Sequence, residues 1–298
     1  MSTATTTPGS SPPVGPMTPV EITVPAPGLA SDLRAIRVVW RREVIRFSQD
    51  RVRIVTALVQ PLLYVFVLGT GLTSLTRSAT GGVSLRTFMY PGVIALSVLF
   101  TAMFSAASIV WDREFGFLRE MLVAPVRRSA IMIGKCLGGA TVATFQGLIV
   151  VAMAGLVHVP YAPLMIVVLF VEMLVLGFCL TALGLVAAAR VRQMQSMMGV
   201  MQMILMPLMF LSGSLYPLRD LPGWLNAAVK LNPITYAVHP IRQVVFDYVE
   251  ADPGALARLN PPITWWGWEV PVMAQLAVVV VTGVMLLSLS VAAFNRAD

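Results

Sequence analysis

Charged residues are scarce in this sequence of 298 residues. Only 12% of them are Asp, Glu, Lys or Arg, whereas a soluble globular domain carries roughly 25%. Hydrophobic residues make up 57% of the chain, and its mean hydropathy is +0.81. A soluble globular fold is therefore excluded, and we expect an integral membrane protein.

Cysteine and histidine are almost absent, which limits the chemistry available to the chain. Cys136 and Cys179 lie in apolar runs, where we expect them to pack as small hydrophobic residues without forming a disulfide. His158 and His239 are the only histidines, and neither belongs to a cluster of metal ligands. We expect no metal site and no catalytic residue, so the chain is not expected to be an enzyme.

A nucleotide-binding loop is also missing from the sequence. The phosphate-binding consensus is G-x-x-x-x-G-K-[ST]. The segment SAIMIGKC, residues 129–136, keeps the Gly-Lys pair but has Ser129 and Cys136 at the first and last positions of that consensus. We therefore expect no ATPase motif and no cofactor on this chain.

Long runs without charge are what the sequence does contain. A helix needs about 20 residues to cross the hydrocarbon core of a bilayer. Charge-poor runs of that length, the longest divided by a proline-bearing break at 158–163, predict six membrane-spanning helices. The predicted spans cover about 54–76, 87–111, 136–157, 164–189, 193–216 and 270–295. The expected fold class is an all-α integral membrane protein.

Lys and Arg are distributed unevenly between the connections of this six-span arrangement. If both termini lie inside, fifteen of these residues fall in inner segments and six in outer segments. Positive charge resists translocation, so we expect both termini in the cytoplasm and a location in the inner (plasma) membrane of the cell. The net charge of +7 follows from this bias and does not indicate a nucleic-acid partner.

The N-terminal part of the chain divides into two regions. Residues 1–31 contain no Lys or Arg and are rich in Pro, Ser and Thr, which predicts a disordered tail before a membrane domain at 32–298. Ser31 is expected to cap a helix that begins at Asp32. Apolar residues recur at helical spacing with arginines between them, which predicts an amphipathic helix in the membrane interface: Leu33, Ile36, Trp40, Val44 and Phe47.

The connection between the fifth and sixth spans, 217–269, is too long for a turn. It is partly apolar and contains several prolines, so we expect an outer re-entrant region whose backbone is shielded by protein. The segment WWGW at 265–268 is expected to lie at the outer interface as part of an aromatic belt.

Two features within the spans are candidates for a substrate path. Glu172 is the only acidic residue within a predicted span, and an intramembrane acid is a functional candidate by default. A structural hydrogen bond and a role in the path are equally open for it. The fifth span is rich in methionine, which suits varied apolar ligands, although helix packing is the interpretation that we favour. The candidate path residues are Glu172, Met201 and Met206.

The stretch DREFGFLREMLVAPVRR, residues 112–128, concentrates seven charges between two apolar runs. On a helix, its apolar residues occupy mainly one side and its charges mainly the other. The positive-inside rule asks only for Lys and Arg, yet three acids are interleaved here. A cytoplasmic protein partner explains this mixture better than membrane topology alone.

The same stretch resembles the signature of the ABC-2 type transporter permeases, close to the daunorubicin-resistance type of exporter permease. The family pattern E-x-G-x-L-x-x-x-L-x-x-P matches Glu114, Gly116, Leu118, Leu122 and Pro125. A second resemblance covers FLSGSLYPLRDLPGWL at 210–225 and NPITYAVHPIR at 232–242. Arg119 stands where many members carry an acid.

The resemblance implies a permease subunit of an ATP-driven exporter, with ATP and Mg held by an ABC ATP-binding subunit on a separate chain. It also implies a second permease, either the same chain or a sister, beside the surrounding membrane lipid. The stretch is then the coupling helix seated in the ATPase, with Glu114, Gly116, Leu118, Arg119, Glu120, Leu122 and Pro125 as its residues.

Three substrate interpretations are open at this point. The leading one is efflux of a hydrophobic drug, as in antibiotic resistance, or export of a lipid. A polysaccharide or glycolipid exporter of the same family is the second, but it would call for an aromatic path where the fifth span offers methionine. An ion-coupled transporter would need several intramembrane ionisable groups, and only Glu172 is present.

Overall fold

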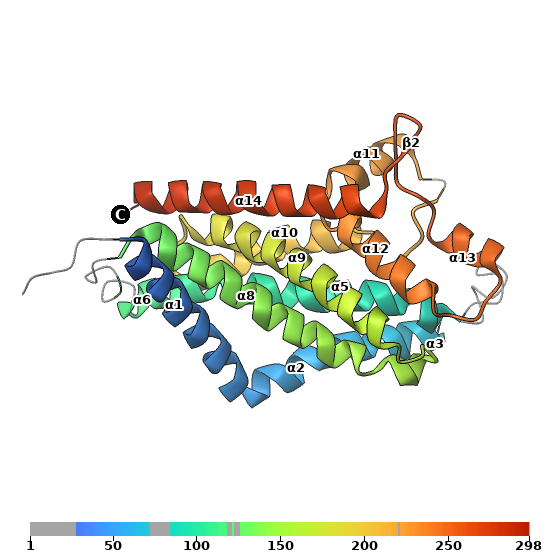
Figure 1. Ribbon diagram of the computed structural model, residues 1–298, viewed down its shortest axis with the longest axis horizontal. Coiled ribbons are helices and arrows are strands. Elements are labelled where there is room, and N and C mark those ends of the chain that lie inside the picture. Colours follow the sequence, from blue (N-terminus) through green and yellow to red (C-terminus); the bar gives the residue numbers. More distant parts are fainter. Residues whose placement is uncertain (1–27, 72–83, 118–120, 122–125, 220, 298) are drawn as a thin grey trace, which may run out of the picture.

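The computed structural model describes residues 28–71, 84–117, 121, 126–219 and 221–297, and Figure 1 shows an elongated bundle of helices. Most of the predicted disordered tail, 1–27, lies outside the described residues. The helices of the first half are α1 (Leu29–Gln49), α2 (Arg51–Leu62), the π-helix η1 (Leu63–Leu68), α3 (Gly69–Gly71), α5 (Leu85–Ala106), α6 (Ser108–Glu114) and α8 (Arg128–Val151). The second half holds η2 (Ala154–Val157), α9 (Pro163–Ala188), α10 (Met194–Phe210), α11 (Gly223–Leu231), α12 (Thr235–Phe246), α13 (Pro253–Leu259), β1 (Thr264–Trp265), β2 (Trp268–Glu269) and α14 (Val272–Ala297).

Within the described residues, five helical segments are long and apolar enough to cross a membrane. They are Ile54–Gly71, Leu85–Glu114, Arg128–Val151, Pro163–Ala188 and Val272–Arg296. The remaining predicted span, the fifth at 193–216, corresponds to α10, an apolar helix of 17 residues. The all-α membrane class is therefore confirmed, and the count of six spans stays a prediction.

The helix α5 forms the centre of the bundle and packs against α8, α9 and α12. Small residues bring these neighbours close: a Cβ on Gly184 of α9 would lie 2.5 Å from the Cβ of Ala106. A Cβ on Gly92 would lie 2.0 Å from the carbonyl oxygen of Ser214, in the turn after α10. The core of the bundle thus depends on helix-to-helix contacts that leave no room for larger side chains.

The first helix begins three residues earlier than predicted, at Leu29. Ser31 does not occupy the cap position; it lies in the first turn, where its hydroxyl donates to the Gly28 carbonyl and accepts from the Gly28 N–H. The helix packs on α8, where Gly134 and Gly138 leave space for Val39 and Glu43. The face expected to rest in the headgroup region is therefore partly buried against protein, and α1 crosses α8 obliquely (Figure 1).

The connection between α10 and α14 is built from α11, α12, α13 and a two-stranded hairpin. The central helix of the three, α12, packs against α5, α9 and α14. Its Arg242 is buried, with the guanidinium 2.7 Å from the Gly213 carbonyl oxygen and over the Phe88 ring. The hairpin was not predicted. Trp266 and Gly267 both have positive φ, as a tight two-residue hairpin turn requires, and the indole N–H of Trp265 donates to the Tyr236 hydroxyl.

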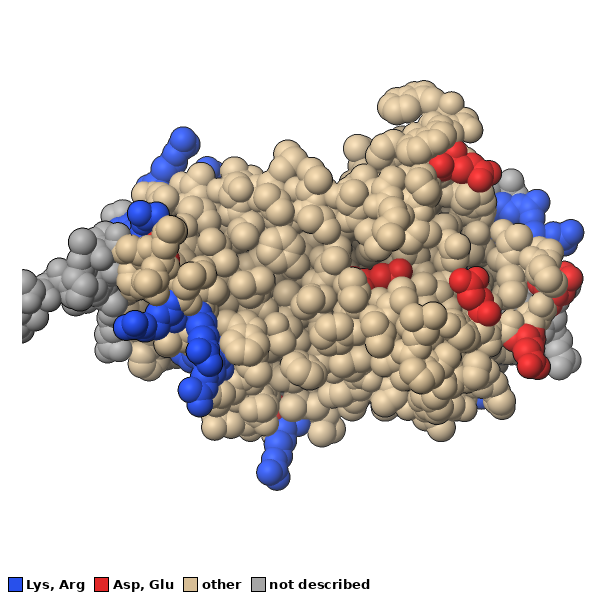
Figure 2. Space-filling model, viewed as in Figure 1, with Lys and Arg blue, Asp and Glu red and all other residues tan. Residues whose placement is uncertain are grey.

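Charge is distributed unevenly along the bundle. Figure 2 shows Lys and Arg gathered at the end where α1 begins and the C-terminus lies, whereas most visible Asp and Glu side chains lie towards the opposite end. The chain therefore enters and leaves the bundle at its positively charged end. The assignment of that end to the cytoplasm stays a prediction.

Candidate functional site

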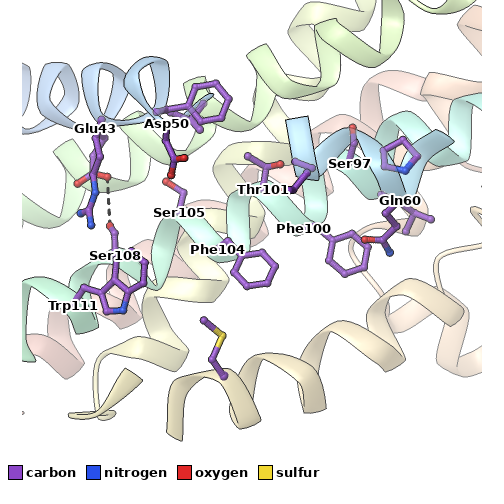
Figure 3. A pocket seen from close by; sticks show the side chains of 18 of the residues that line it. Glu43, Asp50, Gln60, Ser97, Phe100, Thr101, Phe104, Ser105, Ser108 and Trp111 are labelled. Carbon is purple, nitrogen blue, oxygen red and sulfur yellow. Dashed lines mark hydrogen bonds between the residues drawn. The ribbon is translucent and has the colours of Figure 1, made fainter. Parts of the chain in front are cut away.

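A cavity of about 470 Å³ lies between α1, α2, α5, α6 and α10. Figure 3 shows Glu43, Ser108 and Trp111 at one end and Ser97 and Gln60 at the other, with Phe100 and Phe104 between them. The described lining residues are Glu43, Arg46, Phe47, Asp50, Thr56, Ala57, Gln60, Pro61, Tyr64, Val93, Leu96, Ser97, Phe100, Thr101, Phe104, Ser105, Ser108, Trp111, Val142, Met194 and Met198. The cavity therefore combines an apolar middle with polar groups along one wall and an ionic end.

Helical periodicity explains the polar wall of this cavity. Ser97, Thr101 and Ser105 recur every four residues on α5, and Phe100 and Phe104 recur at the same interval beside them. The opposite wall contains Pro61, which removes a backbone donor inside α2. Directly after it, the helix widens into the π-helical turn η1, and such bulges follow the loss of a regular helical bond.

The methionine-rich helix α10 closes the cavity with Met194 and Met198. Its buried residues recur every four positions and pack into the bundle, so Met201 lies in the core, whereas Met206 is exposed. Glu172 is buried in α9, and among the described residues neither of its carboxylate oxygens accepts a hydrogen bond. The described cavity lining does not include Glu172, Met201 or Met206, and their role in a substrate path stays a prediction.

A buried charge network lies at the end of the cavity that Glu43 and Ser108 line. The Lys135 Nζ of α8 lies 2.9 Å from Glu43 Oε1 and 2.6 Å from Asp112 Oδ2. Arg42 NH2 lies 2.6 Å from the same Asp112 oxygen, and the Ser108 hydroxyl accepts from Lys135 Nζ at 2.9 Å. Arg46 NH1 lies farther away, 3.9 Å from Asp112 Oδ1. The network thus ties α1, α6 and α8 together.

Pairing is what keeps these groups charged inside the protein. The side chain of Lys135 is 2% exposed, and that of Glu43 is 5% exposed. Burial alone would raise the pKa of the Glu43 carboxyl, but the charge and hydrogen bond of Lys135 outweigh burial and hold that pKa below its usual value. The partners are 92 and 23 residues from Lys135 in the chain, at positions 43 and 112, so helical spacing gave no signal for the network.

The predicted coupling helix is interrupted close to its start. The helix α6 ends at Glu114, and Gly116 follows with φ of +83°, a conformation that favours glycine and commonly ends helices. Phe115 and Phe117, on either side of Gly116, are both exposed. Of the remaining predicted coupling residues, Leu118, Arg119, Glu120, Leu122 and Pro125 lie outside the described residues.

Arg113 and Glu114 hold the connection between α9 and α10. The Arg113 guanidinium donates to the carbonyl oxygens of Ala188, Ala189 and Val191, at the end of α9. Glu114 Oε2 accepts from the backbone N–H of Met194, the first residue of α10, at 3.0 Å. A cation thus lies at the negative end of one helix and an anion at the positive end of the next. The resemblance implied that Glu114 belongs to the coupling helix; in the structure its carboxylate contacts α10, and a contact with the ATPase stays a prediction.

Comparisons with known proteins agree with this architecture. The family model described as ABC-2 type transporter matches residues 34–246. The chain is 29% identical over 213 residues to the inner membrane transport permease YadH of Escherichia coli, covering 70% of this chain and 81% of YadH. It is 27% identical over 218 residues to nodulation protein J of Rhizobium leguminosarum bv. trifolii, covering 72% and 82% of the two chains. It is also 31% identical over 160 residues to the probable multidrug ABC transporter permease YbhR of Escherichia coli, covering 53% and 43%. The family match alone spans most of the chain, from α1 to the end of α12, so this protein belongs to the ABC-2 type transporter family.

Proposed function

We propose that this chain is the membrane-spanning permease subunit of an ATP-driven exporter that moves a hydrophobic drug or a lipid-like molecule out of the cytoplasm or the inner leaflet. ATP and Mg are held by a separate ABC ATP-binding subunit, and a second permease completes the transporter in the inner membrane. The family membership supports the permease role. The similarity to YbhR, a probable multidrug ABC transporter permease, supports a drug over a long sugar chain.

The cavity between α2, α5 and α10 is the main support for the proposed class of substrate. Its volume of about 470 Å³ is in the range of pockets for drug-sized ligands, roughly 300–1,000 Å³. Phe100, Phe104 and Leu96 offer apolar contact area, and Ser97 and Thr101 offer a few hydrogen-bonding groups. Such a lining suits an amphipathic molecule better than a chain of sugars, which would require a continuous polar and aromatic path.

The coupling route follows from the contacts of Arg113 and Glu114. In this proposal the ATP-binding subunit contacts the turn around Phe115 and Gly116, and closure of the ATPase pair displaces that turn. Because Glu114 binds the first residue of α10, the displacement reaches the helix that supplies Met194 and Met198 to the cavity. Movement of α10 would change the volume available to the substrate.

The direct test compares two phenylalanines in the reconstituted transporter. Phe104 lines the cavity and is 41% exposed, whereas Phe145 of α8 is 47% exposed and lies outside the described lining. With permease and ATP-binding subunit in liposomes, Phe104→Ala should change ATP hydrolysis stimulated by a panel of drugs and lipids, and Phe145→Ala should leave it unchanged. Equal effects of the two variants, or no stimulation by any member of the panel, would refute the assignment.

The proposed orientation has its own measurement. A cysteine introduced beside Arg127 should react with an impermeant thiol reagent only from the cytoplasmic side, and one beside Asp252 only from the outside. The reverse labelling would place the positively charged end of the bundle outside and remove the coupling route.

A further inference from the structure

A second hollow lies on the side of the bundle formed by α1, α8, α9 and α14. Its volume is about 520 Å³. The described lining residues are Leu33, Ile36, Arg37, Trp40, Leu137, Ala140, Thr141, Leu174, Val175, Phe178 and Val280. The indole N–H of Trp40 donates to the Thr141 hydroxyl at 3.1 Å, so these two polar groups already have a hydrogen-bond partner. The groove therefore presents an almost entirely carbon surface to its occupant.

Three arginines of α1 flank this groove. Arg34, Arg37 and Arg41 are spaced three and four residues apart, so they lie on one face of the helix, and all three are exposed. Among the described residues, no acid forms an ion pair with any of them. Arg42 and Arg46 of the same helix differ, because both pair with Asp112. This stripe of Arg34, Arg37 and Arg41 therefore carries three positive charges that pair with no acid among the described residues.

The groove and the stripe lie at the positively charged end of the bundle. Figure 2 shows blue side chains gathered at the end where α1 lies, beside a surface with few other charged side chains. At a lipid interface, arginines lay their apolar stems along hydrophobic surface and keep their guanidinium groups in the polar headgroup region. An occupant must therefore combine a negative head with an apolar tail.

We propose that this groove is a binding site for one anionic glycerophospholipid, with an acyl chain along Leu137, Leu174 and Phe178 and its phosphate on Arg34, Arg37 and Arg41. Anionic headgroups concentrate near clusters of basic residues at the membrane surface. The site is separate from the proposed substrate cavity and does not rest on the proposed function. Because α1 also supplies Glu43 to the charge network, the bound lipid would hold α1 on α8.

The test counts lipids bound to the purified full-length protein by native mass spectrometry. Phosphatidylglycerol or phosphatidylcholine is titrated into the detergent-solubilised protein. Wild type should retain one phosphatidylglycerol in preference to phosphatidylcholine. The variant R34Q/R37Q/R41Q should lose affinity for phosphatidylglycerol about tenfold or more, since each basic residue near the surface contributes to anionic lipid binding.

The matched control removes the same charge elsewhere on the positive end. Arg190, Arg192 and Arg296 are exposed, and R190Q/R192Q/R296Q should bind phosphatidylglycerol as wild type does. Leu137→Trp keeps all the arginines but fills the groove, and it should also weaken phosphatidylglycerol binding. Each variant is first compared with wild type by thermal unfolding without added lipid, and Arg37→Gln alone replaces the triple variant if that variant does not fold.

Three outcomes would overturn the site. Equal affinity of wild type for phosphatidylglycerol and phosphatidylcholine would show that the arginines do not recognise an anionic headgroup. Equal losses of phosphatidylglycerol affinity in the two triple variants would show that net charge, and not this site, determines lipid binding. Separation of permease dimers on Leu137→Trp, without a change in bound lipid, would assign the groove to an interface between copies.

Discussion

Replacing Lys135 by Met should destabilise the protein strongly, because Lys135 holds two buried carboxylates. In wild type the buried Lys135 contacts both Glu43 and Asp112. The substitution leaves the two carboxylates with the partly exposed Arg42 and, at 3.9 Å from Asp112, Arg46. Removing one partner from a buried ion pair costs about 3–5 kcal/mol. Arg42 remains within 2.6 Å of Asp112 and is partly exposed, so we expect the lower part of that range.

The double variant Lys135→Met/Glu43→Gln supplies the diagnostic comparison. It removes one cation together with the anion that this cation contacts, so it should be more stable than the sum of the two single substitutions predicts, by about 1–3 kcal/mol of coupling. The free energy of unfolding would be measured in detergent micelles by denaturant titration. Lys230→Met, at the chain's other lysine, is the control and should change stability by less than about 0.5 kcal/mol. Strict additivity, or a Lys135→Met protein as stable as wild type, would refute the energetic importance of the network.

Three further predictions concern the coupling stretch and the outer region. Glu114→Ala removes the cap on Met194, worth about 1 kcal/mol, so transport should fall while the ATP-binding subunit still co-purifies; loss of co-purification would show that Glu114 binds the ATPase instead. Leu118→Asp should leave the permease in the membrane but reduce recovery of the ATP-binding subunit about tenfold, since burying a leucine is worth about 1.5–3 kcal/mol; normal recovery and transport would contradict the coupling-helix assignment. Burial, with a smaller effect from the charge of Arg242, lowers the pKa of His239 from its usual 6.5 to about 4. The unfolded chain then binds the extra proton first, so thermal stability should fall by up to about 3 kcal/mol as pH decreases from about 6.5 to about 4. His239→Gln should flatten this pH profile, and an unchanged profile would exclude His239 as its source.

Membrane helices were predictable because a charge-free run of about 20 residues has few other structures available to it. The same rule does not show where the helix itself begins. Lys135 was excluded from the predicted span at 136–157, yet α8 begins at Arg128 and includes it. A charge can lie inside a helix when partners neutralise it, and those partners come from distant parts of the chain. Local sequence windows cannot detect such a pairing.

The candidate site was harder to predict than the fold. Methionine occurs throughout α10, so composition could not tell which face meets the cavity, and the structure selects Met194 and Met198. The charges at 112–114 were recognised as unusual, but helical periodicity could not show that Arg113 and Glu114 turn back to the ends of α9 and α10. The outer hairpin has strands of two residues, too short for an alternating pattern to appear.

The buried charge network also bears on how the chain is made. Both carboxylates that neutralise Lys135 precede it in the chain, at Glu43 and Asp112. When translation reaches the third span, its counter-charges have already been synthesised, so the lysine need not enter the bilayer unpaired. An isolated lysine at the centre of an inserting helix costs about 2.5–3.5 kcal/mol on the translocon scale. A circularly permuted chain that delivers α1 last would have to insert Lys135 before Glu43 exists.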